Sequence, residues 1–346
     1  MKKNRLSAYI IAVLGIILLG GFFSIKSLNK ALNEKENKEA KTGAIATKKD
    51  VKIGILQLVS HPALDAIKKG IYEGLEKEGY KDGKNIHIEF KNAEGDQANL
   101  ATMGQKLLAG NNQLVVGITT PAAQVLANKE SKRPIILSGV TYPEKAGLVK
   151  SEKKPGKNVT GVSDRVNIKL QIEQIKEVMP KAKTIGILYT SSEDNAVSQA
   201  KEAKKEVEKL GLKCEMKSVT NTTDLQQIAE QLAKKVDAIY VPIDNGIASS
   251  MATLIQVTDK EKIPVFPSAD TMVKDGGLMG LGVDQYQLGI MTAKVIVDIL
   301  NGKKPEDYPV LISNSGKTYV NKKKAEQLNI TIPDRILKNA EIIGNN

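Results

Sequence analysis

The sequence predicts an α/β fold made of two lobes, each built on a parallel sheet. From residue 51 onwards, apolar runs of strand length alternate with amphipathic segments of helix length, the spacing typical of β–α–β units. This plan occurs twice, beginning with KIGILQL at Lys52 and with TIGILYT at Thr184. A chain of 346 residues, 41% of them hydrophobic, also has the length for about two domains and the material for their cores.

The first 25 residues have the composition of a membrane anchor. Basic residues precede an uncharged run of 20 residues from Leu6 to Ile25, which as a helix would span about 30 Å, the thickness of one hydrocarbon core. The basic flank favours a single-pass protein whose N-terminus stays inside the cell and whose remainder lies outside the cell membrane. A cleaved signal peptide is the alternative, but the apolar run continues through Phe22 and Phe23 and no A-x-A pattern follows promptly. We therefore expect an uncleaved signal-anchor over residues 1–25.

Residues 26–50 predict a charged tether, because they hold almost no large apolar side chains with which to fold alone. Of the formal charge of +12, residues 1–49 contribute +7 from ten Lys/Arg and three Glu. The other residues contain 41 basic and 36 acidic side chains, a charge of +5. The globular part is therefore only mildly basic, and with no Trp and 4% aromatic residues it lacks the pattern of a nucleic-acid interface.

Cysteine and histidine are too scarce for a disulfide or a metal cluster. Cys214 is the only cysteine, so an intramolecular disulfide is impossible, and we expect this residue in a strand as a small buried side chain. His61 and His87 are the only histidines and have no suitably spaced second ligand, so a zinc site is not favoured. We expect no metal and no cofactor.

The first lobe is predicted to contain five strands with helices between them. The expected strands are 51–58, 85–90, 115–118, 135–140 and 158–162. Three helices are expected: one from Pro62 to about Gly79, one from the Asp96 cap to Ala109, and one from Pro121 to Asn128. Thr120 is a good N-cap for the last of these, because Pro121 suits the first helical position.

The second lobe repeats this alternation. Its expected strands are 184–189, 212–219, 238–243, 264–268 and 278–284. Its expected helices are 168–179, a long one capped by Ser191 or Ser192 and ending near Leu210, one capped by Asp224 and ending at Lys234, and 248–259. A helix over 287–300, a strand over 309–313 and a helix capped by Asn321 follow. This pattern predicts parallel sheets with helices on both faces.

Small polar side chains follow nearly every strand at its carboxyl end, where open parallel sheets bind their ligands. They are Gln57, Ser60 and His61; Thr119 and Thr120; Ser138 and Thr141; Ser163 and Asp164; Ser191, Ser192 and Asn195; Asp244 and Asn245; Ser268 and Asp270; and Asp284. Two lobes that face each other would line a cleft with these groups. At Thr119 and Thr120, two hydroxyls and the first N–H groups of a helix converge on one spot that favours a carboxylate.

The sequence carries no recognisable enzyme signature. It lacks a G-x-S-x-G elbow, a Walker A loop, an H-E-x-x-H motif and a G-x-G-x-x-G that opens a helix, since GLMGLG at Gly277 precedes a strand instead. Hydroxyls, amides and isolated carboxylates suit hydrogen bonding of a small zwitterion better than bond cleavage. We expect a binding protein; the alternatives are an anchored enzyme and a sensor module for another membrane protein.

Eight stretches resemble a known family. They are KIGILQLVSHPALD, ITTPAAQ, SGVTYP, NVTGVSD, IGILYTSSEDNA, YVPIDN, PVFPSAD and GLGVDQYQLG. The chain resembles the type I solute-binding proteins of ABC transporters, and specifically the tryptophan/tyrosine-type substrate-binding proteins of Gram-positive bacteria. The resemblance implies two Rossmann-like lobes, capture of an aromatic amino acid, tryptophan first, and delivery to an ABC permease by a monomeric receptor. Many relatives carry a lipobox cysteine, and its absence here supports the helical anchor. A non-aromatic amino acid remains an alternative ligand.

Carried over by position, the same resemblance implies roles for the candidate ligand-binding residues. Thr119, Thr120 and Ser192 with Asn195 would hold the ligand carboxylate, and Asp164 or Asp244, with Asn245 beside it, would pair with the ammonium. Gln57 and Ser268 would complete the polar shell, with Ser163 and Asp270 as further candidates. The side chain that stacks on the ligand stays open among Tyr142, Tyr189, Phe266 and Tyr286.

Three crossings between the lobes are expected, because the chain must leave the first lobe and return to it. Short stretches of small or polar residues place them near 161–163, 283–285 and 313–316. The first lobe would then comprise residues 51–161 and 285–312, and the second 163–283 and 316–346.

Overall fold

The computed structural model describes residues 50–313 and 316–344, which include two parallel sheets, one for each lobe. The expected membrane anchor and nearly all of the expected tether lie outside the described residues. Within residues 50–313 and 316–344, no helix combines the length and the apolar character needed to cross a membrane.

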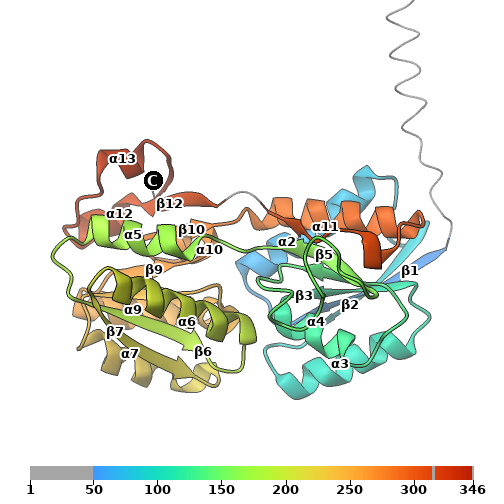
Figure 1. Cartoon of the computed structure of the whole chain (residues 1–346), viewed down its shortest axis with the longest axis horizontal. Helices are drawn as coiled ribbons and strands as arrows, with labels where there is room; N and C mark the ends of the chain where they lie inside the picture. Colours follow the sequence, from blue (N-terminus) through green and yellow to red (C-terminus); the bar gives the residue numbers. More distant parts are fainter. Residues whose placement is uncertain (1–49, 314–315, 345–346) are drawn as a thin grey trace, which may run out of the picture. The chain divides into compact units, whose positions relative to one another are not determined.

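Lobe 1 is built on a six-stranded sheet in which every pair of neighbours is parallel, with the order β11-β5-β4-β3-β1-β2. Its strands are β1 (Val51–Gln57), β2 (Ile86–Asn92), β3 (Leu114–Ile118), β4 (Ile135–Ser138), β5 (Val159–Ser163) and β11 (Leu311–Ile312). Its helices are α2 (Pro62–Lys77), α3 (Gln97–Ala109), α4 (Thr120–Ala127) and α11 (Gln285–Leu300). Helices α2 and α11 cover one face of the sheet, and α3 and α4 cover the other (Figure 1).

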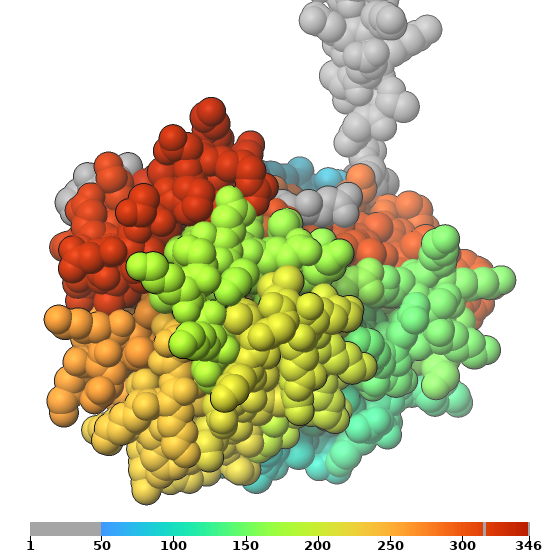
Figure 2. Space-filling view, turned by 60° about the vertical axis from the view of Figure 1, so that its left-hand side comes forward, coloured from blue at the N-terminus to red at the C-terminus, as the bar shows by residue number. Residues whose placement is uncertain are grey.

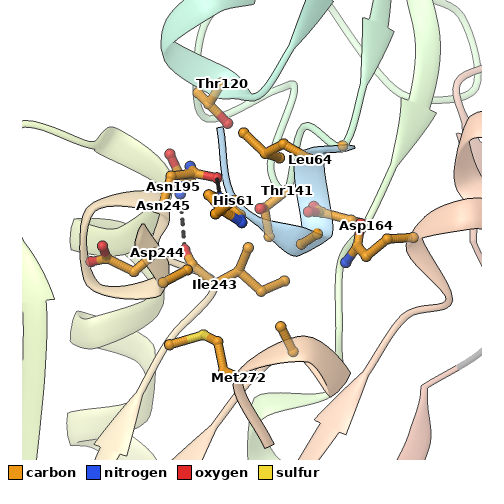
Figure 3. Close-up of a pocket in the computed structure, with 15 residues that line it drawn as sticks. His61, Leu64, Thr120, Thr141, Asp164, Asn195, Ile243, Asp244, Asn245 and Met272 are labelled. Atoms are coloured by element: carbon orange, nitrogen blue, oxygen red, sulfur yellow. Dashed lines mark hydrogen bonds between the residues drawn. The ribbon is translucent and has the colours of Figure 1, made fainter. Parts of the chain in front are cut away.

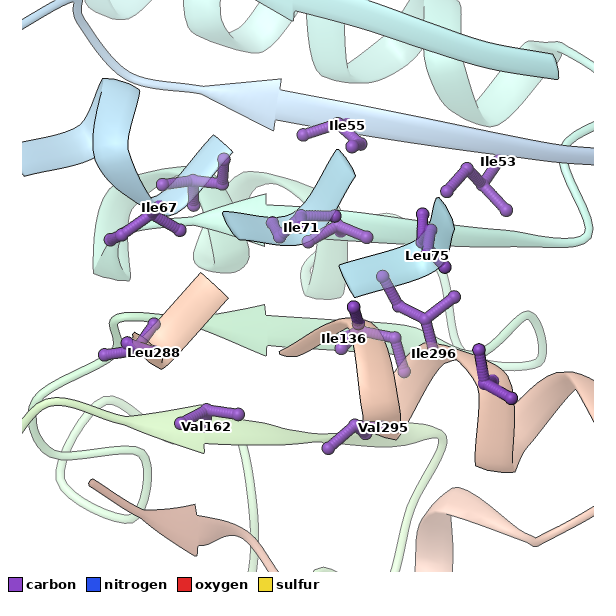
Figure 4. Packing of buried hydrophobic residues seen from close by; sticks show 14 of the residues in the cluster. Ile53, Ile55, Ile67, Ile71, Leu75, Ile136, Val162, Leu288, Val295 and Ile296 are labelled. Carbon is purple, nitrogen blue, oxygen red and sulfur yellow. The ribbon is translucent and has the colours of Figure 1, made fainter. Parts of the chain in front are cut away.

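Helix α2 shows why these residues form this lobe. Pro62 occupies the start of the helix, where a missing N–H does no harm. Ile67, Ile71 and Leu75 recur at helical spacing and are buried against β1 (Figure 4). The first turn of α2 follows His61, so the packing that holds this helix also positions that side chain at the carboxyl end of β1.

Lobe 2 contains a parallel sheet in the order β7-β6-β8-β9 and a smaller sheet in the order β10-β12-β13. The strands are β6 (Thr184–Thr190), β7 (Lys213–Val219), β8 (Ala238–Val241), β9 (Val265–Pro267), β10 (Met279–Gly282), β12 (Lys317–Asn321) and β13 (Ala340–Ile343). The helices are α5 (Ile168–Val178), α6 (Asp194–Lys209), α7 (Leu225–Ala233), α8 (Asn245–Ser249), α9 (Met251–Glu261), α10 (Asp270–Lys274), α12 (Lys322–Gln327) and α13 (Asp334–Leu337). Strand β10 pairs antiparallel with β12, a strand that the sequence analysis missed.

Three of the expected capping residues stand at the N-cap position of their helices, and two of the cap predictions are wrong. Asp96 and Asn321 each accept a backbone N–H at the start of their helices, as predicted. Helix α6 begins after Glu193 instead of a serine, because the Ser191 and Ser192 hydroxyls donate to carbonyl oxygens at the end of β7 and just beyond it. Asp224 is the N-cap residue of α7, as predicted, but makes no side-chain cap bond. The second wrong prediction is Thr120, which lies inside α4.

The chain passes between the two parallel sheets at three places. It leaves the first sheet after β5, which extends to Ser163, and enters lobe 2 at α5. It returns between β10 and α11, and leaves again between β11 and β12. Movement about these crossings stays a prediction.

We predict that Gly289→Ala destabilises the protein, because α2 and α11 cross at two glycines. A Cβ at Gly289 would collide with the carbonyl oxygen of Ile67 and lie 2.9 Å from the Cα of Gly70. Overpacking of this kind costs about 1–3 kcal/mol, and urea unfolding should show a loss of this size. Gly316→Ala is the control, since its nearest neighbour would lie at 3.6 Å, an ordinary contact distance. Equal stability of the two variants would contradict the argument.

Candidate ligand-binding cleft

A nearly closed cleft lies where the carboxyl ends of the two parallel sheets face each other (Figure 3). Its lining residues are His61, Ala63, Leu64, Thr120, Gly139, Thr141, Asp164, Asn195, Ile243, Asp244, Asn245, Ala248, Ala269, Met272 and Gln285. The free space at its centre is ≈ 20 Å³, which admits little more than one water molecule. The lining residues are therefore close together, and the cleft is nearly filled by their side chains.

Hydrogen bonds hold the two lobes together around this cleft. They join His61 to Asn245 (3.3 Å), Gln124 to Asp194 (2.8 Å) and Tyr142 to Glu202 (2.9 Å). Figure 2 shows the yellow surface of lobe 2 meeting the green surface of lobe 1 on the face it displays. The lobes are therefore in a closed arrangement.

Several buried polar atoms around the cleft have no hydrogen-bond partner among the described residues. They are Gln57 Oε1, His61 Nδ1, Thr119 Oγ1, Thr120 Oγ1, Asp164 Oδ1 and Asn195 Oδ1. Buried polar groups in proteins nearly always have a partner, and each one left without costs about 1–3 kcal/mol. Four of these six residues line the cleft itself, which is the arrangement expected where a polar ligand supplies the missing bonds.

The two candidate carboxylates differ in what they are free to bind. Asp244 uses both oxygens within lobe 2, accepting from the backbone N–H and hydroxyl of Thr190 at 2.5 and 2.7 Å and from the N–H of Ile247 at 2.8 Å. Asp164 is 4% exposed and keeps Oδ1 without a partner. Burial raises the pKa of Asp164 to about 6, and a hydrogen bond from Thr141 offsets part of this shift. Asp164 is therefore the carboxylate available to a cation, and Asp244 is a structural cap of α8.

The junction of β3 and α4 holds an unusual backbone conformation. Thr119 has φ 90° and ψ 161°, a region that is almost restricted to glycine and costs about 1–3 kcal/mol for other residues. Neither Thr119 nor Thr120 uses its hydroxyl as a helix cap. Strained residues of this kind cluster at ligand-binding positions, and both hydroxyls are buried without a partner among the described residues.

The structure brings five of the predicted site residues into the cleft lining and leaves six outside it. Those inside are Thr120, Asp164, Asn195, Asp244 and Asn245. Thr119 is adjacent to the lining, and Gln57 is buried behind it with its amide bonded to Asp65. Ser163 donates to the Thr141 carbonyl. The remaining three have partners inside lobe 2.

Those three are Ser192, Ser268 and Asp270. Ser192 is exposed and donates to the Thr220 carbonyl. The Ser268 hydroxyl lies in the core within hydrogen-bond distance of Gln171, Tyr240 and the Val241 carbonyl. Asp270 forms an ion pair with Lys274 at 2.7 Å. Strand-end position alone did not distinguish such structural hydroxyls from ones that face the cleft.

Sequence analysis did not select the apolar wall or two polar members of the lining. The apolar wall consists of Leu64, Ile243 and Met272. His61 and Thr141 were recognised as strand-end polar residues but not chosen, although their position was the available signal. The four aromatic candidates do not line the cleft; Phe266, for example, is fully buried in the lobe 2 core. The apolar residues come from two helices and a loop, and nothing in their local sequence marks them.

Two α/β lobes that enclose a small cleft with orphaned polar atoms define a ligand-binding receptor. The family model described as ABC transporter substrate binding protein matches residues 52–343, so the chain belongs to this family. The chain is accordingly a binding protein and not an enzyme, as the sequence analysis expected.

Three relatives agree with this membership. A tyrosine-binding protein of Clostridioides difficile is 37% identical over 95% of this chain and 93% of its own length. A Streptococcus pneumoniae ABC domain solved in complex with L-Trp is 49% identical, with a TM-score of 0.83 over 85% of this chain and 100% of that one. A ligand-free, open substrate-binding protein from Clostridium difficile is 38% identical, with a TM-score of 0.65 over 86% of this chain and 100% of that one. The present arrangement of the lobes is closer to the L-Trp complex than to the open structure.

We predict that Thr119→Gly is more stable than Thr119→Ala, the reverse of the usual order. Glycine adopts the observed backbone without strain, whereas alanine keeps a Cβ there, and the difference should be about 1 kcal/mol or more in urea unfolding. Both variants lose the hydroxyl and should bind ligand more weakly. A glycine variant less stable than the alanine variant would show that Thr119 is not strained.

Proposed function

We propose that this protein is the extracytoplasmic substrate-binding component of an ABC importer and that it binds an aromatic amino acid, tryptophan first, in the cleft between its lobes. The observation that carries the proposal is the set of four cleft-lining polar residues with buried atoms that have no partner, placed beside an apolar wall. A zwitterion with an apolar side chain would satisfy both parts of this surface.

The polar groups form two sets, one for the ammonium and one for the carboxylate of the ligand. Asp164 is the carboxylate for the ligand ammonium. Asn195, which the resemblance placed at the ligand carboxylate, instead offers Oδ1 as a second acceptor nearby in the lining. The amide of Asn195 is oriented by its Nδ2, which donates to the Ile243 carbonyl at 3.0 Å, so its oxygen is left for the ligand. The Thr119 and Thr120 hydroxyls, at the N-terminus of α4, favour the ligand carboxylate.

The apolar wall would contact the side chain of the ligand once the cleft, whose free space here is ≈ 20 Å³, widens to admit it. Leu64 and Ile243 supply aliphatic surface, and the Met272 thioether is flexible and makes favourable contacts with aromatic rings. The relative solved with L-Trp is 49% identical to this chain, against 37% for the tyrosine-binding protein. We therefore place tryptophan first and tyrosine second.

Closure and membrane location complete the proposal. Ligand bound in the cleft touches both lobes and so favours the closed form by its difference in affinity for the two states. The closed surface is what the permease would recognise, and the receptor acts as a monomer. The uncharged run at residues 6–25 supports an uncleaved anchor that keeps the receptor on the outer face of the cell membrane.

Calorimetric titration of the full-length protein tests the ligand class. We expect L-tryptophan to bind most tightly, L-tyrosine and L-phenylalanine more weakly, and L-leucine weakest. L-tryptophanamide should bind roughly 10- to 150-fold more weakly than L-tryptophan, because a charge-assisted hydrogen bond worth about 1.5–3 kcal/mol is lost. Asp164→Asn should abolish binding and leave the fold intact. No heat with any aromatic amino acid, or full binding by Asp164→Asn, would sink the assignment.

Ligand affinity should fall in acid. The raised pKa of Asp164, about 6, means that its neutral form takes over in the empty cleft as the pH falls below that value. The ligand ammonium pairs with the ionised form, so affinity is constant near pH 8 and declines by up to about tenfold per pH unit below pH 6. Dissociation constants measured from pH 8 to pH 5 check this. An affinity independent of pH over this range would contradict the pairing.

Fractionation tests the anchor. The full-length protein should sediment with membranes and require detergent for release, and a variant with two arginines inserted in the run at residues 6–25 should not, since charges at the centre of a span are costly. Secreted protein whose first residue lies between 24 and 50 would establish cleavage instead.

A further inference from the structure

A buried chain of hydrogen bonds crosses the cleft and begins at Glu193, just before α6. This side chain is 2% exposed, and its carboxylate accepts from the backbone N–H groups of Asn245 and Gly246 at 3.1 and 2.9 Å. It also accepts from Asn245 Nδ2 at 2.5 Å. Burial and the neighbouring Asp244 raise the pKa of Glu193 to about 7, so above that pH the group is a carboxylate with no hydrogen to donate. The amide nitrogen of Asn245 then faces Glu193, and its oxygen faces the other way.

The oxygen of Asn245 faces His61 of lobe 1. His61 Nε2 lies 3.3 Å from Asn245 Oδ1, and since an amide oxygen accepts only, Nε2 must carry the hydrogen. The other ring nitrogen, Nδ1, is then a bare acceptor. His61 is 7% exposed, lines the cleft beside Leu64 and Thr141 (Figure 3), and has no partner for Nδ1 among the described residues. Burial lowers the pKa of His61, which keeps the ring neutral near pH 7.

We propose that His61 Nδ1 accepts a hydrogen bond from an N–H group of the bound ligand, and that Glu193, acting through Asn245, is the positioning residue that fixes this polarity. The inference rests on the proposed function, because it assigns a recognition role within the same cleft. Two N–H sources fit a tryptophan ligand, its ammonium and its indole ring. Asp164 Oδ1, Asn195 Oδ1 and His61 Nδ1 together form a lining rich in acceptors, which favours a ligand rich in N–H donors.

The relay also links recognition to closure. His61 belongs to lobe 1, whereas Asn245 and Glu193 belong to lobe 2, so the polarity of the imidazole is set only when the lobes are together. A ligand that donates to Nδ1 therefore stabilises the closed form through a group that neither lobe presents alone. A ligand with an acceptor at this place meets a second acceptor and is disfavoured.

Nitrogen NMR of the full-length protein, labelled with ¹⁵N-histidine, tests the tautomer directly. The chain has only two histidines, and the exposed His87 is assigned and removed with His87→Gln. At pH 8 we expect His61 to carry its hydrogen on Nε2, and we expect saturating L-tryptophan to shift the Nδ1 signal in the direction of hydrogen bonding. A hydrogen on Nδ1, or an Nδ1 signal that ignores bound ligand, overturns the proposal.

Binding measurements with two analogues identify the source of the N–H. In 3-benzothienyl-L-alanine a sulfur replaces the ring N–H, and indole-3-propionate lacks the ammonium. We compare the affinity of each with that of L-tryptophan in wild type, in His61→Gln and in the control His87→Gln. The glutamine at 61 keeps a donor for Asn245 but has no acceptor at the Nδ1 position.

One of the two affinity ratios should shrink by about tenfold in His61→Gln, since a buried hydrogen bond left unmade is lost. If the ratio of L-tryptophan affinity to 3-benzothienyl-L-alanine affinity falls, the ring N–H is the donor. If the ratio of L-tryptophan affinity to indole-3-propionate affinity falls, the ammonium is the donor. If both ratios match wild type, His61 accepts nothing from the ligand and the proposal is wrong. If no amino acid binds to wild type, the proposed function fails and this inference fails with it.

Glu193→Gln tests the positioning role without touching the ligand. Its amide nitrogen would face Asn245, turn that amide around and present Nδ2 to His61, which must then move its hydrogen to Nδ1. We expect the NMR signals to report the exchanged tautomer and the affected ratio to fall as in His61→Gln. An unchanged tautomer and an unchanged ratio would remove Glu193 from the mechanism.

Discussion

The cleft depends on one constraint: polar atoms of its lining are buried without hydrogen-bond partners in the absence of ligand. Asp164, Asn195, Thr120 and His61 each bury an atom that no described side chain or backbone group satisfies. Each such atom is costly, and the rest of the fold must supply the free energy that keeps the lobes together around them. A ligand that forms hydrogen bonds with these atoms removes that penalty, and the free energy gained contributes to its affinity. This is why an ordinary set of hydroxyls, amides and carboxylates can select a small zwitterion.

The strands and the packed helices of each lobe fix the loops that line the cleft. Parallel strands bring their carboxyl ends to one edge, so loops far apart in the chain converge on the cleft. In lobe 1 the close approach of α2 and α11 at Gly70 and Gly289 holds the start of each helix at that edge. These starts carry His61 and Gln285 into the lining. The packing that stabilises these two helices therefore also fixes the positions of the site residues at their starts.

Within the site, structural and ligand-facing polar groups share the same loops. Asp244 caps α8 and is bound to Thr190, whereas its neighbour Asn245 passes a fixed hydrogen-bond polarity from Glu193 to the opposite lobe. Membership in the family of ABC transporter substrate-binding proteins agrees with this design, since a receptor of this kind must couple the chemistry of its ligand to the position of its lobes. The TM-score is higher against the structure solved with L-Trp, 0.83, than against the ligand-free, open one, 0.65, which fits a cleft whose cross-lobe bonds are formed.

The sequence by itself determined the alternation of strands and helices, the two-lobe plan, the caps at Asp96 and Asn321, and the placement of polar residues at strand ends, because these follow from local periodicity and capping chemistry. It did not separate Ser192 from Asn195, or Asp244 from Asp164. Only the tertiary structure decided these, because a hydroxyl or carboxylate becomes structural or ligand-facing according to which distant backbone groups reach it first. His61 is the clearest case, since the partner that orients its ring lies 184 residues away in the chain, on the other lobe.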